Sequence, residues 1–122
     1  MIIDVSNCFN RYNFGIHVFL PIQLNQCHGS AWKINDDIRA MVTFKKTNLM
    51  VPFDGFGKFD IVFCRNVGVY FNMTDRKKLF GNISRVMEKD GYLIIGATES
   101  LINVDPRYEP KRYLRSVFYQ LK

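Results

Sequence analysis

Residues 59–71, with the sequence FDIVFCRNVGVYF, carry the strongest indication of a fold in this chain. The apolar run Phe59–Phe63 is typical of a parallel strand buried within a sheet. It ends at the polar triplet Cys64–Asn66, and Tyr70 follows closely. Open α/β sheets bind their ligands at the carboxyl ends of such strands. The stretch therefore predicts an α/β fold with a site beside these side chains.

The amino-terminal part of the chain predicts shorter elements. Met1–Val5, Ile16–Leu20 and Val42–Phe44 are short apolar stretches that predict strands, and residues 35–41 predict a short helix with acidic residues in its first turn. Pro52–Gly57 is rich in turn formers and predicts a loop.

The carboxyl-terminal part predicts a helix, a strand and a hairpin. Asn72 or Thr74 would cap the helix, and Asp90-Gly91 would end it. Tyr92–Gly96 predicts a second buried strand, and Tyr108–Tyr119 predicts an antiparallel pair. The apolar stripe of the helix would consist of Leu79, Phe80, Ile83, Val86 and Met87.

Composition limits the class of protein. A chain of 122 residues with 48% hydrophobic residues fits one packed domain rather than a disordered segment. It contains no apolar run of the ~20 residues that a membrane span needs, and its first residues do not form a signal peptide. These features predict a cytoplasmic protein without membrane insertion.

The cysteines and the charges give weaker signals. Cys8, Cys27 and Cys64 lack C-x-x-C spacing, so we expect free thiols and no metal site. The net charge of +6 arises from short clusters such as Arg76–Lys78. Such clusters are commonly the solvated faces of helices, but they would also attract an acidic protein or nucleic acid phosphates.

Residues 41–100 resemble the S-adenosylmethionine-binding domain of the chemotaxis-receptor glutamate O-methyltransferases, the CheR family. The triplet Cys-Arg-Asn followed by Tyr-Phe is the most specific part of the likeness. The matching words are Met41–Phe44, Asn48–Leu49, Phe59–Asn66, Val69–Phe71, Gly91–Gly96 and Glu99–Leu101.

This resemblance implies a partial class I, Rossmann-like methyltransferase domain: an α/β fold with a mostly parallel sheet and a carboxyl-terminal antiparallel hairpin. Residues 31–122 would form the carboxyl-terminal part of that domain, and residues 1–30 would be a segment of uncertain role. The family's glycine-rich loop and ribose-binding acidic residue have no counterpart in residues 1–40. We therefore expect a fragment or a truncated chain that by itself binds the cofactor weakly or not at all.

The resemblance also implies the chemistry. The function would be methyl transfer from S-adenosylmethionine to glutamates of a chemoreceptor helix, with S-adenosylhomocysteine as product. Arg65 and Tyr70 would be catalytic, and Gly68 would loosen the loop before Tyr70. The cofactor-binding residues would be Asn48, Leu49, Cys64, Arg65 and Asn66.

Two alternatives and one structural problem stay open at this stage. The chain could instead be a small basic module that stacks nucleic acid bases on aromatic residues such as Trp32, although it has no RNP-like or G-x-x-G word. It could also be a non-catalytic interaction module.

The class I strand order would leave two strands missing between Val42–Phe44 and Phe59–Phe63. Either residues 1–20 or a second copy would fill that gap, and we expect the second copy, hence a homodimer through an exposed sheet edge.

Overall fold

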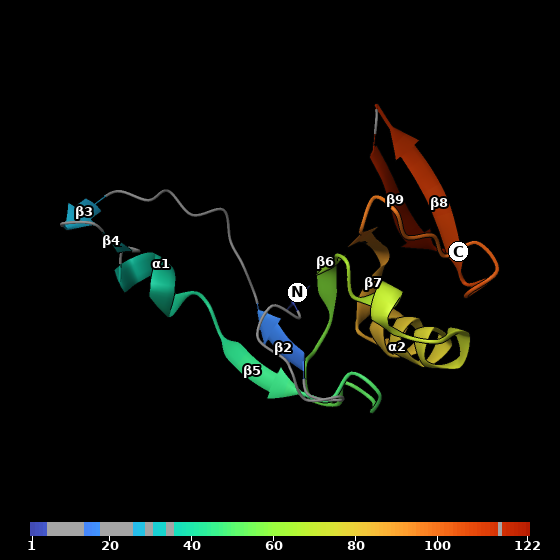
Figure 1. Cartoon of the computed structure of the whole chain (residues 1–122), viewed down its shortest axis with the longest axis horizontal. Coiled ribbons are helices and arrows are strands. Elements are labelled where there is room, and N and C mark those ends of the chain that lie inside the picture. The colour runs from blue at the N-terminus through green and yellow to red at the C-terminus, as the bar shows by residue number, and fades with distance from the viewer. Residues whose placement is uncertain (5–13, 18–25, 29–30, 34–35, 115) are drawn as a thin grey trace.

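A computed structural model describes residues 1–4, 14–17, 26–28, 31–33, 36–114 and 116–122. The main sheet has seven strands in the order β5-β2-β1-β6-β7-β9-β8 (Figure 1). The short hairpin β3 (Gln26–His28) and β4 (Ala31–Lys33) and the helix α1 (Asp36–Ala40) lie at the opposite end of the molecule from β8 and β9. The sheet strands are β1 (Ile2–Asp4), β2 (Phe14–His17), β5 (Phe44–Thr47), β6 (Phe59–Cys64), β7 (Met87–Ile95), β8 (Tyr108–Tyr113) and β9 (Ser116–Leu121).

The central strand confirms the α/β prediction. Strand β6 pairs in parallel with β1 on one side and with β7 on the other. The remaining pairings of the main sheet, β1–β2, β2–β5, β7–β9 and β8–β9, are antiparallel. The sheet is therefore mixed rather than mostly parallel, with its parallel part around β6 and the predicted antiparallel hairpin at its carboxyl-terminal edge.

The predicted gap in the sheet is filled by the chain itself. Strand β1 pairs with β6 through Ile2↔Phe63 and Ile3↔Cys64, and β2 joins β1 to β5. The expectation that a second copy would supply the missing strands was wrong, because residues 2–4 and 14–17 already occupy both places between β5 and β6. The carboxyl-terminal half of this edge of β6 is thus paired within one chain.

Helix α2 (Met73–Arg85) begins at the first of the two predicted caps, with the Asn72 side chain accepting a hydrogen bond from the Asp75 N–H at 2.9 Å. It ends at Arg85 rather than at Asp90-Gly91. The Phe59 N–H donates to the Val86 carbonyl at 2.8 Å, and β7 begins one residue later beside β6. Pairing with β6 therefore overrides the helical period, although all five stripe residues are buried as expected.

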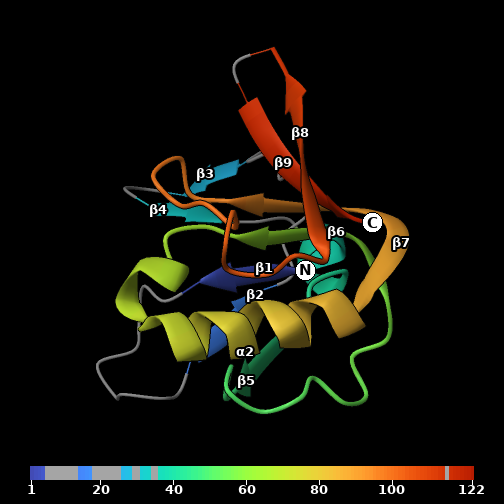
Figure 2. The ribbon, with the colours of Figure 1, turned by 90° about the vertical axis from the view of Figure 1, so that its right-hand side faces the viewer.

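Helix α2 lies across one face of the sheet (Figure 2). On that face Val62 and Leu93 are fully buried and belong to the hydrophobic core. On the other face Ile61 is 45% exposed and Tyr92 is 41% exposed. The prediction that Phe59–Phe63 and Tyr92–Gly96 are buried strands was thus only half right, because within the described residues a helix covers only one face. No helix among the described residues is long and apolar enough to cross a membrane.

The remaining elements are displaced from their predicted bounds. Strand β5 begins at residue 44 instead of spanning 42–44, and β2 begins at Phe14, while residues 18–20 of that prediction lie outside the described part. The loop at 52–57 is confirmed, and Gly55 and Gly57 both adopt positive φ angles there, 77° and 75°.

Candidate functional site

Four strands of the main sheet run in the same direction and end at one edge. Strands β1, β6 and β7 are mutually parallel, and β5 shares their direction because β2 is antiparallel to both β1 and β5. Residues 65–66 follow β6, residues 96–99 follow β7, and Asn48 follows β5. This edge is where an open α/β sheet binds its ligand.

A cavity of about 650 Å³ opens at this edge, between the ends of β6 and β7 and the β8–β9 hairpin. Arg65, which follows β6, and Arg112, which lies in β8, both line it, together with Ser100 and Ser116. Neither arginine forms an ion pair with any described residue. The only carboxylate among the lining residues belongs to Glu99, so the cavity presents more positive than negative charge.

The Glu99 side chain is buried, with 9% exposure, and binds backbone groups of two loops. Its Oε2 accepts hydrogen bonds from the Asn66 N–H at 2.9 Å and from the Gly96 N–H at 2.7 Å. Its Oε1 accepts from the Val69 N–H at 3.1 Å. One carboxylate thereby connects the loop after β6 with the loop after β7.

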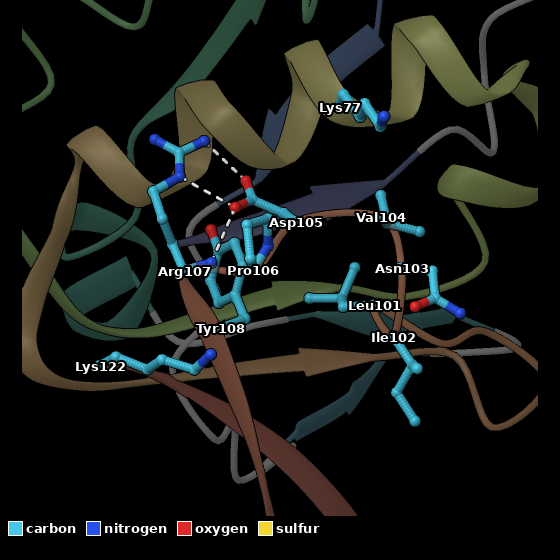
Figure 3. Close-up of a pocket in the computed structure, with 10 residues that line it drawn as sticks. All are labelled: Lys77, Leu101, Ile102, Asn103, Val104, Asp105, Pro106, Arg107, Tyr108 and Lys122. Atoms are coloured by element: carbon cyan, nitrogen blue, oxygen red, sulfur yellow. Dashed lines mark hydrogen bonds and ion pairs between the residues drawn. The ribbon is translucent and has the colours of Figure 1, made fainter.

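A second cavity, of about 710 Å³, lies between α2 and the segment that connects β7 to β8 (Figure 3). Lys77 and Lys122 line its rim, and the side chains of Asp105 and Arg107 are paired with each other at 2.6 Å. It is slightly larger, but none of the residues predicted to be catalytic or cofactor-binding lines it. We assign the candidate site to the cavity that contains Arg65, since size alone does not identify a ligand site.

The structure brings part of the predicted site together. Arg65 is exposed and lines the cavity, and Asn66 follows it with a left-handed backbone, φ 56°. Tyr70 ends a short 3₁₀ helix, η1 (Gly68–Tyr70), and is 70% exposed, beside the site rather than among the residues that line the cavity. Gly68 does not loosen this loop, because it is buried and η1 is connected to Glu99 through Val69.

Three other predicted residues are placed differently. The side chains of Cys64 and Leu49 are fully buried in the core, where a cofactor cannot contact them without a rearrangement. Burial, and then the nearby charge of Glu99, raises the pKa of the Cys64 thiol far above its usual value, so the thiol stays protonated. Asn48 accepts a hydrogen bond from the Met50 N–H at 2.9 Å, which is the local turn that an Asn after a strand commonly forms.

Sequence reasoning assigned no role to Glu99, Ser100 or Arg112. Glu99 and Ser100 belong to a word that carries the family resemblance, but nothing in the word indicates what the carboxylate binds. Arg112 belongs to one of the short basic clusters, for which a solvated surface and an acidic partner both stayed open, and the β8–β9 hairpin, paired with β7 through β9, brings it to the cavity. No sequence pattern could have identified it.

Comparison with known proteins agrees with this architecture. Residues 23–115 match the family described as CheR methyltransferase, SAM binding domain. The chain is 37% identical over 90 residues to chemotaxis protein methyltransferase 1 of Vibrio cholerae, covering 74% of this chain and 33% of that protein. It is 40% identical over 81 residues to the chemotaxis protein methyltransferase of Borreliella burgdorferi, covering 64% of this chain and 28% of that protein. The chain thus spans about a third of the length of the curated relatives that it matches.

Proposed function

Because the chain belongs to the CheR methyltransferase family, we propose that it serves in the S-adenosylmethionine-dependent methylation of glutamate side chains on a chemoreceptor. The cavity at the carboxyl ends of β6 and β7 is the observation that carries this proposal. Two arginines line this cavity, and neither has an ion-pair partner among the described residues. The family match, which covers most of the chain, supports the same function.

The cavity has the size of a small-molecule site, and polar side chains line it. A volume of about 650 Å³ lies within the range of small-molecule sites. Asn48 lies at the same edge as Arg65 but three strand spacings away, which corresponds to about 14 Å along the edge. An extended ligand across the strand ends would contact both, with Asn48 at the adenine and Arg65 and Asn66 toward the methionine part. S-adenosylmethionine supplies a sulfonium methyl group as the donor.

The acceptor chemistry suits this set of side chains. A glutamate carboxylate is already anionic at neutral pH and needs no general base. Methyl transfer breaks the sulfur–methyl bond and forms an oxygen–methyl bond, so the two opposite charges are neutralised and no proton moves. The site must hold the two reactants in line and exclude water. We assign the orientation of the acceptor carboxylate to Arg65 and Arg112, and we place the Tyr70 hydroxyl beside the reacting atoms.

The partner that fits this site is a glutamate-bearing receptor helix, attracted by a chain with a net charge of +6. We place this function in the cytoplasm. Homodimer formation stays a prediction, and in the described sheet it would now use β5 or β8, which are the two edge strands. Light scattering at micromolar concentration measures it.

Calorimetric titration with S-adenosylhomocysteine tests the cofactor site. We expect weak binding by residues 1–122 and tighter binding by a version extended upstream, because the glycine-rich loop of the family has no counterpart in this sequence. Arg65→Ala should reduce the affinity of the extended version, whereas Arg85→Ala, an equal loss of charge at the end of α2, should not. The same affinity in the Arg65 and Arg85 variants would refute the assignment of Arg65.

Methyl transfer to a receptor fragment tests the acceptor side. In the extended version, Arg65→Ala and Tyr70→Phe should lower the rate of transfer by more than they lower thermal stability. Both residues are exposed, so little packing is lost. Unchanged activity per folded molecule would assign both residues to structure alone.

A further inference from the structure

Glu99 connects two loops that are distant in the sequence. Asn66 and Val69 are 33 and 30 residues away from it, and both donate their N–H groups to its carboxylate. The Gly96 N–H, three residues away, donates to the same carboxylate. Arg65 directly precedes this loop, and Tyr70 directly follows Val69.

The buried charge of Glu99 is held by backbone dipoles. Within the described residues no lysine or arginine forms an ion pair with it. Hydrogen bonds to an ionised acceptor are stronger than neutral ones, and several N–H groups that converge on one carboxylate stabilise its charge. The arginines of the cavity are therefore left available for another anion.

The loop after β6 has a conformation that needs such support. Asn66 has a φ of 56°, a left-handed conformation that is unfavourable for residues with a side chain and is least unfavourable for Asn and Asp. This turn follows the residue that lines the cavity, and it points the Asn66 N–H at the Glu99 carboxylate. Among the described residues, Glu99 supplies the hydrogen-bond acceptor for that N–H.

The packing around the carboxylate leaves no room for a side chain. A Cβ atom on Gly96 would lie 2.3 Å from Asn66 Oδ1 and 2.7 Å from Glu99 Oε2. A Cβ atom on Gly68 would lie 2.9 Å from Glu99 Oε1. Both glycines therefore permit the close approach of the two loops on the carboxylate.

We propose that Glu99 is a positioning residue: its carboxylate binds the N–H groups of Asn66, Val69 and Gly96 and so fixes Arg65 and Tyr70 relative to the acceptor side of the cavity. The proposal deepens the methyl-transfer function and rests on it for its catalytic consequence. The loop contacts themselves can be tested without any activity.

The test compares Glu99→Gln with Asp105→Asn. Both variants replace a buried carboxylate of the β7–β8 connection by an amide, but Asp105 does not line the cavity that contains Arg65. Glutamine has one acceptor oxygen and a competing NH₂ group, so it cannot accept all three N–H groups. Amide hydrogen exchange should accelerate about tenfold or more at residues 66, 69 and 96 of Glu99→Gln. It should stay unchanged there in Asp105→Asn. The S-adenosylhomocysteine dissociation constant of the extended version should rise about tenfold in Glu99→Gln only.

Each result decides a separate claim. Unchanged exchange at these amides, or equal acceleration throughout α2 and β7, would overturn the positioning role. Accelerated exchange with an unchanged dissociation constant and an unchanged rate of methyl transfer would also overturn it. If the extended version without substitutions does not bind S-adenosylhomocysteine, the proposed function fails, and the exchange data still decide the loop contacts. If Glu99→Gln does not fold, Gly96→Ala replaces it and should accelerate exchange at residues 66 and 69.

Discussion

Two buried carboxylates in the segment between β7 and β8 perform different structural tasks. Glu99 accepts N–H groups from a loop about thirty residues earlier in the chain, whereas Asp105 binds Arg107, only two residues away. Glu99 has 9% exposure and Asp105 has 5%, so both are shielded from water. The difference shows that similar burial can serve either a long-range connection at a ligand site or the closure of one turn.

The largest expected effect is that of Glu99→Ala. It removes the acceptor of three N–H groups and should lower the free energy of unfolding by about 3 kcal/mol, since each unsatisfied buried donor costs about 1–3 kcal/mol and entering water offsets part of the loss. Urea unfolding measures the change. If Glu99→Ala lowered the free energy of unfolding by less than Asp105→Ala does, the proposed difference between the two carboxylates would be wrong.

Asp105→Ala should have a smaller effect, about 1.5 kcal/mol. The variant loses the hydrogen bonds that Asp105 accepts from the Arg107 backbone N–H at 3.1 Å and from its Nε at 2.9 Å. Arg107 is 52% exposed, so water screens the pair and solvates the arginine after the change. Amide exchange should accelerate in the turn at 105–108 and not at residues 66 and 69. Acceleration at those distant residues would show that the two carboxylates are coupled.

Protonation of the Asp105 carboxylate in acid should reduce the stability of the turn that it forms with Arg107. Burial acts to raise the pKa of the Asp105 carboxyl, but the hydrogen bonds and the charge of Arg107 outweigh burial, and the pKa lies below its usual value. The stabilisation is therefore complete above the unfolded pKa of 3.8 and is lost as the pH falls through the lower folded pKa. The stability difference between the unaltered chain and Arg107→Ala should shrink below pH ~4. A difference independent of pH would contradict this assignment.

The smallest expected effect is that of Tyr119→Phe. The Tyr119 hydroxyl accepts a long hydrogen bond, 3.3 Å, from the Leu101 N–H in the same connecting segment. Its loss should cost about 0.5 kcal/mol, because the ring and its packing remain. Thermal unfolding measures it. A cost as large as that of Asp105→Ala would mean that the segment depends on this contact as much as on its ion pair.

The sequence by itself determined the strand after Lys58 and the carboxyl-terminal hairpin, and it narrowed the start of α2 to Asn72 or Thr74. Each depends on local patterns: an apolar run, a capping side chain and alternating residues around a turn. The polar triplet after β6 also predicted a ligand site at the carboxyl end of that strand, and the role of Arg65 there stays a prediction. The predictions of strand, helix and hairpin hold because their physical cause lies within a few neighbouring residues.

Only the tertiary structure decided which segments complete the sheet and what organises the site. Residues 2–4 and 14–17 fill the gap beside β6 through backbone pairing, which the short apolar stretches there do not specify. The end of α2 at Arg85 follows from the pairing of β7 with β6. The role of Glu99 depends on N–H groups 30 and 33 residues away, and that of Arg112 on the fold of the hairpin against the ends of β6 and β7. Contacts between distant residues arise when the chain packs, so no local pattern encodes them.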